Sequence, residues 1–174
     1  DRAVLAAGPV VGGAPVGIGM TVCYDLRFPH LYRDLAQAGA QVLIGGQRTL
    51  EETGGLYVEP TIFDGVDNAM KIAQEEIFGP VLSIIPFDSE EEAVAIANDT
   101  PYGLTNYVQS QDGARRNRLA RQLRAGMIEM NGESRGRGAA FGGVKASGRA
   151  REGGVWGLEE FMDSKQISGW DKDA

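Results

Sequence analysis

The chain has 174 residues, of which 43% are hydrophobic and 24% are charged, and its formal net charge is -7 at pH 7. This length suits one domain with a real core, and the composition is typical of a globular protein without an apolar run that could cross a bilayer. The negative charge argues against nucleic acid as a partner, because phosphate backbones would be repelled. One cysteine, Cys23, and one histidine, His30, exclude an intramolecular disulfide and a Cys/His zinc site. A reducing cytoplasm fits this cysteine usage best.

The first quarter of the chain predicts a strand, a helix and a second strand. Residues 16–24 predict a buried strand, Pro29 opens a helical pattern that continues to Gly39, and residues 41–44 predict the next strand. This order is typical of a parallel strand-helix-strand unit. It would place Cys23 at the carboxyl end of the first strand, where α/β proteins commonly carry their reactive residues.

The rest of the chain continues this alternation. Ser89 followed by Glu92 is a capping box, which predicts a helix that begins there and stops before Pro101. We also expect strands at residues 56–60, 81–86, 104–108 and 127–130, helices at residues 112–125 and 152–160, a long loop at residues 132–148 and a final extended segment at residues 161–170. The predicted fold class is therefore α/β, with strand-helix-strand units around a mainly parallel sheet.

Two carboxylates and an aromatic ring stand close together in the segment from Gln74 to Pro80, which reads Gln-Glu-Glu-Ile-Phe-Gly-Pro. A carboxylate can accept two hydrogen bonds from a vicinal diol such as a ribose, and an aromatic ring can pack against a flat heterocycle. In a purely structural interpretation, the two acids end a surface segment before a Gly-Pro turn while Phe78 packs inside. The residues taken alone favour the structural interpretation.

The segment from Ala140 to Gly148 is rich in glycine and could bring backbone close to a ligand, because glycine permits close approach and positive φ. It does not match the dinucleotide fingerprint, since Phe141 stands where the third glycine should fall. Taken alone, a plain flexible loop explains this composition as well.

These motifs follow one another in a fixed order. The order is Pro60-Thr61, Gln74 to Pro80, Ala97-Asn98, Tyr102-Gly103-Leu104, Ala125-Gly126, Asn131, Phe141-Gly142-Gly143, Ser147-Gly148, Arg151-Glu152 and Gly157-Leu158-Glu159. In this order and spacing, residues 45–170 resemble the C-terminal part of the catalytic domain of the aldehyde dehydrogenase superfamily. The resemblance implies a partial aldehyde dehydrogenase catalytic domain at residues 45–174.

The resemblance also implies roles for particular residues. Glu76 would bind the nicotinamide ribose hydroxyls of NAD or NADP, Phe78 would lie beside the nicotinamide, and Phe141 would lie at the substrate entrance. The family oxidises an aldehyde to a carboxylic acid, and its closing segment, which matches Phe161 to Ile167, joins a neighbouring subunit's sheet, so a homo-oligomer is expected. The family's catalytic cysteine, general-base glutamate and cofactor domain lie upstream of the matching region. We therefore expect little activity from this chain alone.

A second resemblance surrounds Cys23, in the sequence Cys-Tyr-Asp-Leu-Arg-Phe-Pro. Residues of about 9–44 resemble the nucleophile region of the nitrilase, or carbon-nitrogen hydrolase, superfamily, in which such a cysteine attacks an amide or nitrile carbon. That family's glutamate base and lysine lie upstream of anything present here, and a thiol of ordinary pKa without a proton acceptor is a weak nucleophile. The alternative is a half-buried thiol without turnover. We expect the two segments, residues 1–44 and 45–174, to join near residues 38–46.

Three functional hypotheses follow from these patterns. The chain is an incomplete aldehyde dehydrogenase that lacks its nucleophile, or an amide or nitrile hydrolase fragment that uses Cys23, or a non-catalytic assembly piece. In the third case it would associate with a full-length relative through its final extended segment. The identity of the aldehyde and the choice of NAD or NADP are left open, because the residues that select them lie outside the matching region.

Overall fold

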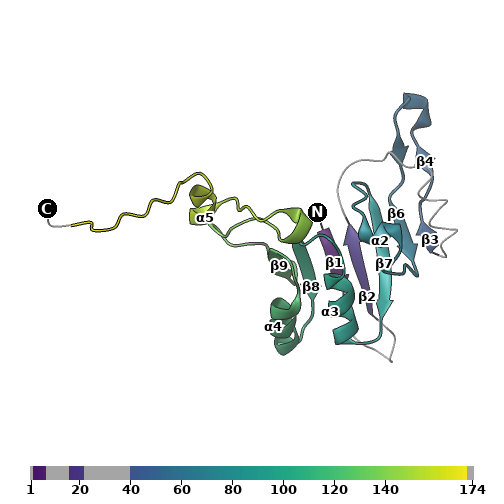
Figure 1. The fold of residues 1–174 in the computed structure, drawn as a ribbon. Helices are drawn as coiled ribbons and strands as arrows, with labels where there is room; N and C mark the ends of the chain where they lie inside the picture. Colours follow the sequence, from purple (N-terminus) through teal and green to yellow (C-terminus); the bar gives the residue numbers. More distant parts are fainter. Residues whose placement is uncertain (1, 7–15, 22–39, 172–174) are drawn as a thin grey trace.

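A seven-stranded sheet forms the centre of the fold in the computed structural model, which describes residues 2–6, 16–21 and 40–171 (Figure 1). The strands follow the order β3-β6-β7-β2-β1-β8-β9. Their bounds are β1 (Arg2–Ala6), β2 (Val16–Thr21), β3 (Gln41–Ile44), β6 (Thr61–Asp64), β7 (Val81–Phe87), β8 (Thr105–Gln109) and β9 (Met127–Met130). A separate two-stranded hairpin consists of β4 (Arg48–Thr49) and β5 (Tyr57–Val58).

Four α-helices and two short 3-10 turns connect the strands within the described residues. They are α2 (Lys71–Gln74), α3 (Glu90–Asn98), α4 (Gly113–Gln122), α5 (Gly154–Glu159), η1 (Glu51–Thr53) and η2 (Lys145–Ser147). None of these helices is long and apolar enough to cross a membrane, a finding that covers only the part of the chain that the structure describes.

Five of the seven strands run in one direction. β6 pairs parallel with β7, and β8 pairs parallel with both β1 and β9. The two reversed strands are β2, which runs antiparallel to both β7 and β1, and β3, which runs antiparallel to β6. The predicted α/β class with a mainly parallel sheet is confirmed. The units β6-α2-β7 and β8-α4-β9 each connect neighbouring parallel strands. The predicted strands at residues 16–24 and 41–44 correspond to β2 and β3, but β6 and β7 lie between them in the sheet. Cys23 and the helix predicted from Pro29 to Gly39 lie outside the described residues.

The capping box predicted for α3 is present. The Ser89 Oγ accepts a hydrogen bond from the Glu92 backbone N–H at 3.1 Å, and the Glu92 Oε2 accepts one from the Asp88 N–H at 2.7 Å. These bonds satisfy donors that a helix start leaves without partners. The helix then turns Ala93 into the core, which fixes the side of α3 that faces the sheet.

The helix predicted at residues 112–125 ends earlier, at Gln122. Leu123 adopts an extended backbone, with φ -74° and ψ 129°, and its side chain is buried with Leu119 and Val108. The Asn98 side chain accepts a hydrogen bond from the Arg124 N–H at 2.7 Å and donates one to the Gln122 carbonyl at 2.9 Å. Burial and these tertiary bonds stabilise the early end of the helix.

Two apolar clusters form most of the core. The larger one is centred on the fully buried Phe63 of β6 and includes Val81 and Ile85 of β7 and Ile72 of α2. The smaller one joins β8 to α4. The sequence patterns did not predict β6 or α2, whose four residues each are too short for a clear periodicity.

The C-terminal segment extends away from the sheet (Figure 1). The predicted helix at residues 152–160 corresponds to α5, and the residues after it form no strand within the described part of the chain. Phe161 is 92% exposed and Trp170 is 71% exposed. Large apolar side chains that are this exposed are typical of a surface that contacts another molecule.

Candidate functional site

The candidate residues gather at the amino ends of the parallel strands. The segment from Gln74 to Pro80 leads directly into β7, and Gly103 and Gly126 precede β8 and β9. The Gly103 carbonyl accepts hydrogen bonds from the N–H groups of Gly126 and Val144, both at 2.9 Å. The loop after β9 therefore returns to the same edge of the sheet.

Glu76 and Phe78 project from the short connection between α2 and β7. Phe78 has a positive φ of 52°, which is unusual for a residue with a side chain, and the residue is 39% exposed. Ile77 packs against the core instead, so the structural interpretation that put Phe78 inside is wrong. The Glu76 carboxyl is partly buried, and this burial raises its pKa. A partly desolvated carboxylate beside an exposed ring can accept hydrogen bonds from a diol and pack against a flat ring.

Side-chain hydrogen bonds attach this connection to the end of α3. The Gln74 Nε2 donates to the Asp99 carbonyl at 2.9 Å and to the Asn68 carbonyl at 2.7 Å. The Asn68 Nδ2 donates to the Asp99 Oδ2 at 2.8 Å. The position of Glu76 and Phe78 thus depends on residues some 25 positions later in the chain.

Backbone contacts on both sides hold the segment around Phe141. The N–H and carbonyl groups of Phe141 and Glu152 bond reciprocally at 2.8 Å, and the Arg151 Nη1 donates to the Gly143 carbonyl at 2.7 Å. Gly142 is buried and packs against Gly126. A Cβ atom added at Gly126 would overlap the Gly142 carbonyl. Because the backbone is fixed at these points, the segment is an ordered structure and not the plain flexible loop of the alternative interpretation.

Lys145 attaches this same segment to the end of α3. Its Nζ donates to the Asn98 carbonyl at 2.8 Å and to the Thr100 carbonyl at 3.1 Å, and burial lowers its pKa. An ammonium group at the carboxyl end of a helix also interacts favourably with the helix dipole. The Gly103 N–H donates to the Ser147 Oγ at 3.0 Å, which adds a second attachment.

Residues 98–103 are therefore a common anchor for both candidate segments. Gln74 reaches this anchor from the side of Glu76 and Phe78, and Lys145 reaches it from the side of Phe141. Sequence reasoning did not find the anchoring roles of Gln74 and Lys145, because neither stands in a local pattern that predicts a distant partner. Among the described residues, no group of three or more His, Cys, Asp or Glu side chains could hold a metal ion.

The comparisons with known proteins agree with this arrangement. A model of the aldehyde dehydrogenase family matches residues 27–167. The chain belongs to the aldehyde dehydrogenase family. A solved aldehyde dehydrogenase from Bartonella henselae is 52% identical, with a TM-score of 0.77, and the match covers 82% of this chain and 30% of that one. A Mycobacterium tuberculosis aldehyde dehydrogenase, solved with NAD+, is 41% identical with a TM-score of 0.75, over 83% of this chain and 31% of that one.

This aldehyde dehydrogenase chain is a partial catalytic domain. An aldehyde dehydrogenase relative from Staphylococcus saprophyticus is 47% identical over 77% of this chain but only 28% of its own length. The family match begins at residue 27, inside the segment that also resembles nitrilases. The nitrilase resemblance has no support in these matches. It stays a prediction, as does the boundary at residues 44 and 45.

Proposed function

We propose that this chain supplies one wall of the site of an NAD(P)-dependent aldehyde dehydrogenase, which residues from the rest of such an enzyme complete. The observation that carries the proposal is the common anchor at residues 98–103, which holds the segments of Glu76 and Phe141 in one rigid arrangement. Rigid positioning of the groups around a substrate is a large part of enzymatic rate enhancement. The overall reaction converts an aldehyde, NAD(P)+ and water into a carboxylic acid, NAD(P)H and a proton.

The residues around Glu76 fit a nicotinamide nucleotide. A ribose offers two neighbouring hydroxyl donors, and the partly buried carboxylate of Glu76 offers the matching acceptors. The exposed ring of Phe78 offers an apolar face for the nicotinamide. When bound, NAD(P)+ supplies the hydride acceptor. Glu76 then orients the ribose, and Phe78 limits the positions that the ring can take.

Phe141 bounds the side where the aldehyde enters. Its backbone is fixed by the pairing with Glu152, and its ring is half-buried. An apolar ring at this point excludes water and favours the carbon chain of a substrate. The thiol nucleophile and the base that the reaction requires belong to the complementary part of the enzyme.

We also infer that the chain assembles with other subunits in the cytoplasm through residues 161–167. Phe161 and Met162 are 92% and 69% exposed, and an exposed extended segment can pair its backbone with a neighbouring sheet. This exposed segment is also the observation that favours the second candidate function, a non-catalytic assembly piece.

A chimera tests the enzymatic proposal. Residues 45–167 of this chain would replace the matching region of the Bartonella henselae enzyme, and NADH formation would be followed with a neutral aldehyde such as butanal. We expect turnover, and we expect Glu76→Gln to raise the KM for NAD+ about tenfold, because the substitution removes a charged hydrogen-bond acceptor.

Glu75→Gln is the matched control, because Glu75 is exposed and pairs on the surface with Lys71 at 3.4 Å. This control should leave the KM for NAD+ unchanged. A folded chimera that binds NAD+ but oxidises no aldehyde would overturn the proposal. Equal KM values for the Glu76→Gln and Glu75→Gln chimeras would remove the role of Glu76.

A further inference from the structure

The segment that surrounds Phe141 carries the opposite charge from the chain as a whole. Residues 133–152 contain five basic side chains and two acidic ones, Glu133 and Glu152, in a chain whose net charge is -7. The basic residues are Arg135, Arg137, Lys145, Arg149 and Arg151. A local cationic surface on an acidic protein attracts anions to that place.

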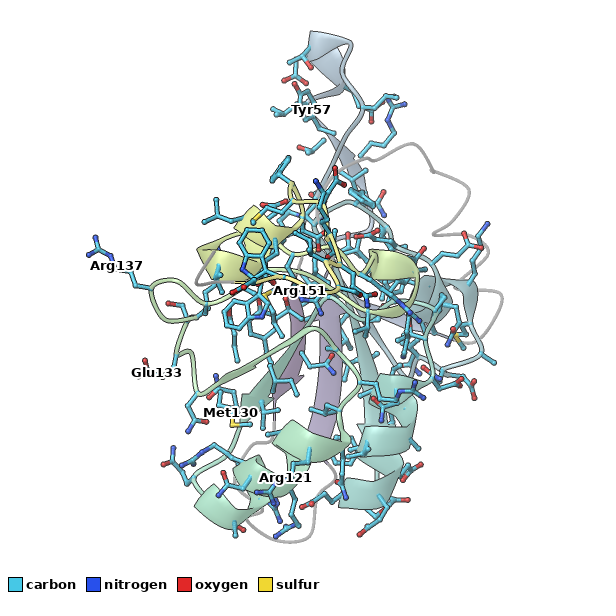
Figure 2. All side chains as sticks on the ribbon, turned by 60° about the vertical axis from the view of Figure 1, so that its left-hand side comes forward. Tyr57, Arg121, Met130, Glu133, Arg137 and Arg151 are labelled. Carbon is cyan, nitrogen blue, oxygen red and sulfur yellow. The ribbon has the colours of Figure 1, made fainter. Side chains whose placement is uncertain are left out.

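The basic residues of this segment do different things. Lys145 and Arg151 bind backbone carbonyls and so stabilise the segment itself. Arg137 points away from the body of the molecule at the far end of the loop (Figure 2). Arg135 differs from all of these, because its guanidinium carbon lies 5.0 Å from the centre of the Phe141 ring.

The contact between Arg135 and Phe141 orients a cation at the proposed entrance. A ring face attracts the guanidinium through its charge and does not require hydrogen bonds from its N–H groups. These N–H groups can therefore donate hydrogen bonds to a ligand. Within the described part of the chain, no carboxylate forms an ion pair with Arg135. Residues 131–139 are exposed, which lets a substrate reach the guanidinium from solvent.

We propose that Arg135 makes the entrance selective for aldehydes that carry a carboxylate at the end away from the carbonyl. The inference rests on the proposed function, in which Phe141 bounds the aldehyde's path. One guanidinium presents two parallel N–H donors, and this pair matches the two oxygens of one carboxylate. The Phe141 ring beneath it contacts the carbon chain, so the two side chains together recognise a charged end and an apolar linker.

A binding experiment on the full chain tests the proposal without any turnover. Succinate is the probe, and its neutral diamide, succinamide, is the control ligand. In 1H–15N spectra we expect succinate to shift the Arg135 Nε–H and the Gly136 amide in a saturable way, while succinamide leaves both unshifted. The shifts should be lost in Arg135→Gln and kept in Arg137→Gln, because Arg137 points away from the site.

The chimera provides the second arm. We expect Arg135→Gln to lower kcat/KM for succinic semialdehyde about tenfold relative to butanal, mainly through KM, because the charged two-donor contact with the carboxylate is lost. Arg137→Gln should leave this ratio unchanged. An unchanged ratio in Arg135→Gln, or succinate shifts that persist in that variant, would overturn the inference. A chimera that oxidises neither aldehyde would instead refute the proposed function, and the succinate titration would still decide whether Arg135 binds a carboxylate.

Discussion

At the scale of single residues, the candidate site depends on places where two backbones come unusually close. Gly126 is the clearest case, because a Cβ atom there would overlap the Gly142 carbonyl and lie 2.7 Å from the Gly143 Cα. Only a residue without a side chain allows the start of β9 to pack against the segment that follows Phe141. The contact therefore links the sheet to one wall of the site.

Gly126→Ala should destabilise the chain by about 1–3 kcal/mol, because the obstructing atoms are backbone and the segment must move to accept a methyl group. The free energy of unfolding in urea measures this effect. Gly136→Ala is the matched control, since a Cβ atom at Gly136 meets nothing within 4 Å. Equal stabilities of the two variants would contradict the close packing of Gly126.

At the scale of elements, an ionic contact fixes the start of α3 against α4. The Glu90 carboxylate accepts hydrogen bonds from the Arg118 Nε at 2.9 Å and from the Arg115 Nε at 3.0 Å. The bond from Arg118 is the main cause that lowers the pKa of Glu90, and Arg115 adds to it. Since the other end of α3 carries the anchor at residues 98–103, this contact helps to position the site.

The Glu90 contact predicts a pH dependence. A carboxyl whose pKa is lowered on folding stabilises the folded state above its ordinary pKa of 4.5, and this contribution is lost as the pH falls through the lowered value. Glu90→Gln should therefore be slightly less stable than the parent chain at pH 7, and the difference should vanish in acid. Urea unfolding from pH 7 to pH 3 measures it. Because the side chains of Arg115 and Arg118 are 44% and 50% exposed, high salt should also reduce the difference. A difference that is constant with pH would show that the charge contributes nothing.

At the scale of the whole molecule, apolar side chains are exposed on β3 and on the C-terminal segment, which lie at opposite ends of the fold (Figure 1). At the edge of the sheet, Leu43 and Ile44 of β3 are 54% and 58% exposed. Because successive residues of a strand face opposite sides, both faces of β3 are uncovered. At the other end lie α5 and the extended segment after it. The chain spans only 28% to 31% of the relatives reported above, so much of the surface that a complete enzyme buries is open here.

Removal of residues 161–170 should reduce self-association and co-purification with a full-length relative, because it deletes the exposed segment proposed to join a neighbouring sheet. Sedimentation velocity at several concentrations measures the association. Leu43→Lys is the comparison variant, since it places a charge at the opposite edge and leaves the C-terminal segment intact. If the truncated chain associates as strongly as the parent chain, residues 161–167 do not form the interface.

Local patterns in the sequence were enough to predict part of this fold. The capping box at Ser89, the apolar run that forms β7 and the strand at residues 127–130 depend on neighbours within a few positions, and the structure confirms all three. The order of the motifs was also enough to predict the aldehyde dehydrogenase family, which the family match confirms. The roles of Glu76, Phe78 and Phe141 remain predictions that the chimera tests.

The amino-acid sequence by itself determined the family, the α/β class and the elements whose signals are local. Only the tertiary structure decided that α4 ends at Gln122, that Phe78 faces outward and that both candidate segments share one anchor. The physical reason is distance along the chain: Lys145 bonds to a carbonyl 47 positions earlier, and Gln74 to one 25 positions later. Such bonds form because folding brings these residues together, and no local periodicity or propensity encodes them.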